Sequence, residues 1–121
     1  MRFLSIYKSP ETGVAPTAEY MADMLKLIEE MAKAGVLLAT EGCLPTSKGA
    51  RVRLAGSKLT VTDGPFAETK EVIGGFALLQ VKSKEEAIEI TKRFLKVAGE
   101  GECELRELYE QPAFAPGDTR K

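Results

Sequence analysis

The residues best suited to chemistry lie in segment 63–71, which reads Asp-Gly-Pro-Phe-Ala-Glu-Thr-Lys-Glu. Asp63 follows an alternating apolar segment that predicts a strand, so its carboxylate is expected where a strand meets a loop. A carboxylate in that position can act as a general base if it faces a partly desolvated pocket. An aspartate before Gly-Pro can equally accept hydrogen bonds from the backbone of its own turn. Asp63 is therefore a candidate catalytic residue, and the two roles are compatible if the turn lines a pocket.

Three charged residues are candidate substrate contacts. Glu68 and Lys70 alternate in the same segment, where they could bind a polar molecule, pair across a dimer interface, or form a solvated surface. Arg53 alternates with apolar residues on a predicted hairpin strand, and its guanidinium could hold a carboxylate through two parallel hydrogen bonds. An arginine on a hairpin at the edge of a sheet can also simply face solvent.

Two aromatic residues complete the candidate substrate contacts. Tyr7 is expected on the face of the first strand that turns away from the helices, with its hydroxyl free to bond a ligand. Phe66 is expected to anchor its loop in an apolar pocket, and a ring that faces the ligand is the alternative.

Several kinds of site are not expected. The chain has no histidine, the commonest general base near neutral pH and the commonest metal ligand. Cys43 and Cys103 lack the short paired spacing of zinc or redox motifs and are interpreted as buried free thiols. No glycine-rich phosphate loop is present either, so the sequence implies no cofactor and no metal.

Charge and length restrict the partners and the domain count. Seventeen basic and eighteen acidic residues give a formal charge of −1 without a basic cluster, so nucleic acid and anionic membranes are not expected partners. No basic leader or long apolar stretch follows Met1, and a cytoplasmic protein is therefore expected. A chain of 121 residues is the size of one ordinary domain.

Periodicity predicts six strands and two helices. The strands are expected at residues 2–8, 36–44, 50–54, 58–62, 76–82 and 103–109. One helix is expected to begin after Thr17 and end at Gly35, with Met24, Leu25 and Ile28 among its buried residues. The other is expected to begin after Ser83 and end at Gly99.

The order of these elements, β-α-β-(hairpin)-β-α-β, predicts an α+β fold of ferredoxin-like layout. Both helices should then pack on one face of an antiparallel sheet. The other face is expected to carry Phe3, Tyr7, Phe76 and Leu78, an apolar patch too large to leave open to water. A second copy of the chain is the simplest cover, so a homodimer is predicted.

Segment 63–71, together with Val52-Arg53 before it and Gly74-Gly75-Phe76 after it, resembles the signature of the YCII-related family, in particular its DGPF branch. Residues 34–37 (Ala-Gly-Val-Leu), 41–44 (Glu-Gly-Cys-Leu) and 104–106 (Glu-Leu-Arg) extend the resemblance. The resemblance covers nearly the whole chain. It predicts a family domain at residues 1–110 and a tail at residues 111–121.

This resemblance implies a dimeric α+β barrel in which two sheets pack face to face. Founding members of the wider family have an active site built around a His-Asp pair, and without a histidine only Asp63 can be carried over. The resemblance also implies an association with extracytoplasmic-function sigma factors.

Two functions remain open at the level of sequence. One is a cofactor-independent enzyme that acts on a small polar or carboxylated molecule, with Asp63 as proton acceptor. The other is a non-catalytic module that binds a small ligand or engages a sigma factor through the same loop.

Overall fold

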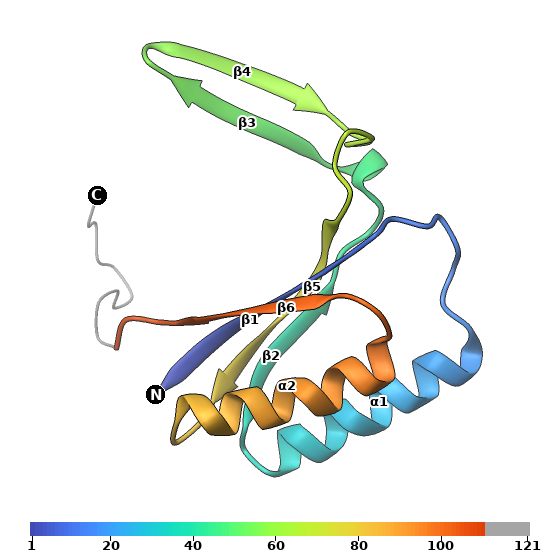
Figure 1. Ribbon diagram of the computed structural model, residues 1–121, viewed down its shortest axis with the longest axis vertical. Coiled ribbons are helices and arrows are strands. Elements are labelled where there is room, and N and C mark those ends of the chain that lie inside the picture. The colour runs from blue at the N-terminus through green and yellow to red at the C-terminus, as the bar shows by residue number, and fades with distance from the viewer. Residues whose placement is uncertain (111–121) are drawn as a thin grey trace.

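The computed structural model describes residues 1–110, and Figure 1 shows how the elements are arranged. In chain order they are β1 (Arg2–Ser9), α1 (Ala18–Lys33), β2 (Leu37–Gly42), the short 3₁₀ turn η1 (Thr46–Lys48), β3 (Ala50–Ala55), β4 (Lys58–Asp63), β5 (Val72–Gln80), α2 (Lys84–Ala98) and β6 (Glu102–Glu107). The predicted tail at residues 111–121 lies outside the described residues.

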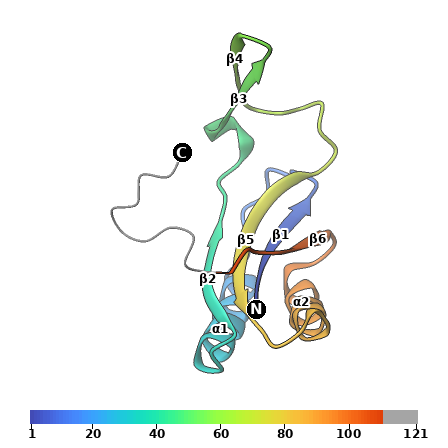
Figure 2. The same ribbon diagram turned by 90° about the vertical axis from the view of Figure 1, so that its left-hand side faces the viewer.

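Four strands form one antiparallel sheet in the order β2-β5-β1-β6. The two helices lie side by side along one face of this sheet (Figures 1 and 2). This is the ferredoxin-like α+β layout that the element order predicts. No helix within residues 1–110 is long and apolar enough to cross a membrane.

Both predicted helix starts are capped as expected. The hydroxyl of Thr17 accepts a hydrogen bond from the backbone of Tyr20 at 3.0 Å, and Ser83 accepts one from Glu86 at 3.1 Å. The Glu86 carboxylate accepts in turn from the backbone N–H of Lys82, one residue before the cap. These bonds satisfy donors that the first turn of a helix leaves without partners.

The core lies between the sheet and the helices. Phe3 of β1, Leu79 of β5, Val81 and Ala87 of α2 form its buried cluster, and Ala87 is completely covered. Half-buried apolar side chains from β2, β6 and α2 pack around this cluster. α1 adds its own buried residues, Leu27 and Met31.

The prediction that Phe3 and Tyr7 face away from the helices is wrong. Phe3 is 3% exposed in the core, and the Tyr7 ring makes an edge-on contact with Phe94 of α2 at a centroid distance of 5.3 Å. Strand alternation determines which residues share a face, but not which face the helices cover. That choice depends on packing partners far along the chain.

The opposite face of the sheet carries Leu4, Ile6, Phe76 and Leu78, and we call it the open face. Ile6 pairs with Phe76 and Leu4 pairs with Leu78 across the β1–β5 register, so the four side chains lie together. Phe76 is 38% exposed and the other three are half-buried. No element within residues 1–110 packs on this face, so an uncovered apolar patch is present with Phe76 and Leu78 in it as expected.

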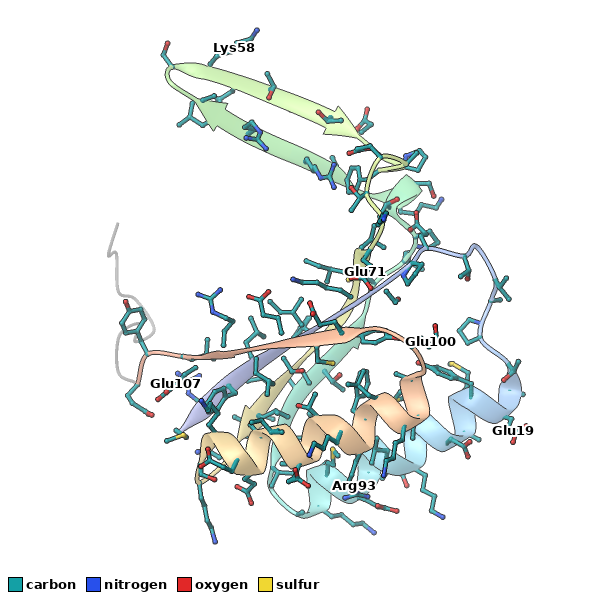
Figure 3. The ribbon with its side chains drawn as sticks, viewed as in Figure 1. Glu19, Lys58, Glu71, Arg93, Glu100 and Glu107 are labelled. Atoms are coloured by element: carbon teal, nitrogen blue, oxygen red, sulfur yellow. The ribbon has the colours of Figure 1, made fainter. Side chains whose placement is uncertain are left out.

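The β3–β4 hairpin, residues 50–63, forms a separate two-stranded sheet, which we call the arm. Its strands pair only with each other, so the expectation that it lies on the edge of the main sheet is wrong. The arm projects from the molecule on the side opposite the helices (Figures 1 and 2). Lys58 at its turn lies far from the helix layer that carries Arg93 (Figure 3).

The start of one strand and one predicted buried residue also differ. β5 begins at Val72 instead of residue 76, because the Gly74-Gly75 pair, which breaks the apolar pattern, is accommodated within the strand by an irregularity opposite Tyr7 and Lys8. In α1 the buried residues are Leu27 and Met31, whereas Leu25 is 58% exposed. This helix is rich in Met and Leu, so more than one of its sides carries apolar residues, and the sequence pattern alone does not show which side is buried.

Replacing leucines on the two sides of α1 tests this assignment. We expect Leu27→Ala to lower the free energy of unfolding by about 2–4 kcal/mol, because it leaves a cavity in the core. Leu25→Ala should change it by no more than about 0.5 kcal/mol. Urea unfolding followed by circular dichroism measures both, and equal losses in the two variants would contradict the observed orientation of α1.

Candidate functional site

The candidate site is built around the motif loop, residues 64–71, which connects the arm to β5. Gly64 leaves β4, and its N–H donates to the carbonyl of Gly49 at 3.0 Å. A Cβ atom at Gly64 would lie 1.6 Å from the carbonyl oxygen of Thr46. Only glycine allows the two backbones to approach this closely, so the root of the arm is held by a contact that a side chain would prevent.

Thr46 connects three segments that are distant in sequence. Its N–H and hydroxyl donate to the two carboxylate oxygens of Glu11, each at 2.7 Å. The same hydroxyl accepts from the N–H of Phe66 at 3.1 Å. These bonds join the β1–α1 loop, the turn after β2 and the motif loop. The hydrogen bonds from the Thr46 backbone and hydroxyl hold the pKa of the Glu11 carboxyl below its ordinary value.

Arg51 of β3 organises the rest of the motif loop. Its guanidinium lies over the Phe66 ring at 3.8 Å from the centroid and donates to Glu68 at 2.5 Å and to Thr69 at 3.0 Å. Backbone hydrogen bonding and the Arg51 bond lower the pKa of Glu68. The arginine that meets the motif is therefore Arg51, and its planar group is already engaged by an aromatic face and a carboxylate.

The structure brings together only two of the six predicted site residues, Phe66 and Glu68, through Arg51. Asp63 and Arg53 are exposed on the arm, where they pair with Ala50 and Thr60 respectively. No hydrogen bond or ion pair of the Asp63 carboxylate is found among residues 1–110. Lys70 is exposed on the motif loop.

Tyr7 lies on the helix side and away from the motif. Its hydroxyl donates to the backbone carbonyl of Glu100 at 2.9 Å and is 3.4 Å from that of Gly99. These bonds tie β1 to the connection between α2 and β6. The geometry gives Tyr7 a structural role at the end of the core.

Of the two cysteines, Cys43 is exposed, so its interpretation as a buried thiol is wrong. Cys103 is half-buried on the helix side of β6, and burial raises the pKa of its thiol. No group of three or more His, Cys, Asp or Glu side chains in the described part of the chain is arranged to hold a metal ion.

A cavity of about 440 Å³ lies beside the Glu11–Thr46 contact. Its walls are the β1–α1 loop (residues 9–16), the segment after β2 (residues 43–45) and the start of β5 (residues 72–74). Most of the lining side chains are apolar, and Glu11 is the one charged residue among them. Two smaller hollows of about 390 and 320 Å³ share part of this wall and extend it to Thr46 and Phe66.

Sequence reasoning missed Glu11, Thr46 and the contact made by Arg51. Glu11 and Thr46 lie 35 residues apart and Thr46 and Phe66 lie 20 apart, so no local pattern reports their bonds. The available signal was indirect. A Pro-rich loop follows β1 and a Thr-Ser-Lys-Gly loop follows β2, and because both strands pair antiparallel with β5, these loops leave the sheet at the same edge.

Comparison with known proteins shows the family of the chain. The sequence matches the YCII-related domain over residues 1–111. The chain belongs to the YCII-related family. It is also 35% identical over 72 residues to an uncharacterized protein of Rhizobium meliloti (strain 1021). That match covers 60% of this chain and 58% of the relative, so it spans a little over half the length of each protein.

Adding a methyl group at Gly64 tests the close contact at the root of the arm. We expect Gly64→Ala to lower the free energy of unfolding by about 2 kcal/mol or more, because the Thr46 carbonyl must move. Gly49→Ala is the matched control, since a Cβ there would make an ordinary contact at 3.6 Å. It should cost no more than about 0.5 kcal/mol by thermal unfolding. Equal effects would show that the Gly64 contact is not needed.

The Glu11–Thr46 contact should weaken in acid. The folded-state pKa of Glu11 is lowered, so the bond is present above the ordinary value of 4.5 and is lost as the pH falls through the lower folded value. The backbone amide signals of Thr46 and Phe66, followed by NMR, should shift over that acidic range.

Replacing the carboxylate separates this titration from those of other acidic groups. In Glu11→Gln the shift of the Thr46 amide signal should disappear, while Glu29→Gln on the exposed side of α1 should leave it unchanged. A wild-type titration that persists in Glu11→Gln would show that another group governs the contact.

Proposed function

We propose that this YCII-related protein binds a small, largely apolar molecule with a neutral or positively charged polar end in the cavity beside Glu11. The cavity volume of about 440 Å³ falls within the range of small-molecule sites and carries this proposal. Its walls are mainly apolar, with a few polar groups at the rim from Ser9, Thr12 and Cys43. Such a lining favours burial of an apolar body and orientation of one polar group.

Charge decides which polar end is favoured. Glu11 is the charged residue of the lining, and its pKa is lowered by its bonds to Thr46, which keeps it anionic at neutral pH. A carboxylated ligand would meet a like charge, whereas an amine would meet an opposite one. The carboxylated substrate considered from the sequence is thus less favoured than a neutral or cationic ligand.

The proposal is one of binding and not of turnover. Asp63, the carboxylate that could act as a general base, stands exposed at the end of β4 and does not line the cavity. Glu11 lines it, but both its oxygens already accept hydrogen bonds from Thr46. A general base must lie within hydrogen-bond reach of the proton that it removes, which Asp63 does not for a molecule in this cavity, and the bonds from Thr46 lower the pKa of Glu11 and so make it a weaker base.

We also propose that the protein works as a homodimer through the open face. Leu4, Ile6, Phe76 and Leu78 form a continuous apolar surface that no element within residues 1–110 covers. An apolar patch at the centre of a sheet is typical of a surface that meets a partner. A second copy offers the same apolar centre, bordered by the charged Glu104 and Arg106 of β6, and suits a two-fold interface with a polar edge.

A matched ligand series tests the cavity. Benzylamine, benzyl alcohol and benzoate share one ring and differ in the charge of their polar end, so we expect their affinities to fall in that order. Benzylamine should bind with a Kd of about 1 mM, reasonable for so small a molecule. NMR titration should show shifts at residues 9–16, 43–45 and 72–74.

Filling the cavity provides the control. Ala15→Trp places a large ring in the lining and should abolish these shifts, whereas Ala55→Trp near the tip of the arm should preserve them. Tightest binding by benzoate would contradict the charge argument. Shifts confined to other segments would place the site elsewhere.

A further inference from the structure

The arm has two chemically different faces. Pairing places Val52 opposite Val61 and Leu54 opposite Leu59, and these four aliphatic side chains share one face. The other face carries two arginine–threonine pairs, Arg51 with Thr62 and Arg53 with Thr60. The aliphatic side chains are 65–71% exposed, although residues of this type are commonly buried.

The arm is attached firmly at its root and uncovered along its length. Gly64 bonds Gly49, and Arg51 packs on the motif loop, so the direction of the arm is determined by short contacts. Beyond the root its strands pair only with each other. A lone two-stranded hairpin is marginally stable in water, and an exposed apolar hairpin has free edges that favour aggregation.

We propose that the apolar face of each arm packs against a second copy of the chain, so that two arms clasp the homodimer that the open faces form. This inference rests on the proposed dimer and assigns the arm its partner. The arm and the open face lie on the same side of the helix layer, and the arm extends back over the sheet (Figure 1). A copy docked on the open face therefore comes within its reach.

The area needed by a stable dimer supports this occupant. Strand geometry makes the whole sheet surface around the open face about 20 Å square, or about 400 Å² in projection with the charged Glu104 and Arg106 of β6 included, and the arm about 20 Å by 10 Å, or about 200 Å². A standard interface buries about 800 Å² of accessible surface per partner. The open face alone falls short of this. The two surfaces together approach it, because side-chain relief makes accessible area larger than projected area.

Two-fold symmetry explains why the second surface belongs to the same chain. In an isologous dimer each copy supplies one arm and one open face, so every apolar surface is covered and none is left to recruit further copies. The assembly therefore stops at two copies of the chain. It also gives Asp63, at the root of the apolar face of the arm, a place at the dimer interface.

Charged substitutions on the two faces of β4 test the clasp. We expect Leu59→Lys/Val61→Lys to raise the dimer Kd at least about a hundredfold in sedimentation equilibrium, because it places two ammonium groups in the interface. Thr60→Lys/Thr62→Lys adds the same charge to the same strand on the opposite face. It should change the Kd by no more than about threefold.

The outcomes separate the failure of the arm from the failure of the dimer. A wild-type dimer whose Kd is unchanged in both double variants overturns the clasp and leaves the open-face dimer standing. A wild-type protein that stays monomeric at all concentrations overturns both. Ligand binding is measured separately by the benzylamine titration, so its result does not depend on either.

A cross-link keeps the test valid if the lysines unfold the arm. Benzoylphenylalanine in place of Val61, in a mixture of light and isotope-labelled chains, should give mixed cross-links to peptides of β1, β5 or β6. Cross-links confined to single chains would overturn the proposal.

Discussion

Thr46 lies at the centre of the connections that shape this end of the molecule. Its backbone and hydroxyl bind the Glu11 carboxylate, and its hydroxyl accepts from Phe66, while its carbonyl passes so close to Gly64 that no side chain fits there. The wall of the cavity, the motif loop and the root of the arm all meet at this residue. Movement of Thr46 would disturb all three, because each is held by bonds to the same short turn.

The motif of the YCII-related family has a clear structural meaning in this chain. Gly64 allows close backbone approach, Phe66 stacks under Arg51, and Glu68 pairs with the same arginine. The ion pair is exposed and contributes little by itself, but stacking and hydrogen bonding around one guanidinium restrict the loop to one conformation. The motif residues with these contacts therefore hold the root of the arm, and Phe66 lines the two smaller hollows next to the cavity, while Asp63 stands outside that arrangement.

Burial is unevenly distributed between the two sides of the sheet. The helix side holds a compact core with Ala87 completely covered, while the open face and the arm leave aliphatic side chains in contact with water. A domain of this size buries only part of its surface, and an apolar surface that remains is most often a binding surface. The cavity beside Glu11 and the apolar surfaces are thus separate features of the molecule, and the small molecule and the second chain that we propose for them would bind at different places.

The sequence by itself determined the element order, the helix caps at Thr17 and Ser83, and the resemblance to the YCII-related family, because each depends on neighbouring residues or a local motif. Only the tertiary structure decided that Phe3 and Tyr7 face the helices, that the arm stands apart from the main sheet, and that Arg51 reaches the motif. Only the tertiary structure also showed the hydrogen bonds that Thr46 makes with Glu11 and Phe66. A strand pattern is symmetric between its two faces, and a hydrogen bond across 35 residues leaves no trace in local periodicity, so these features required the folded chain.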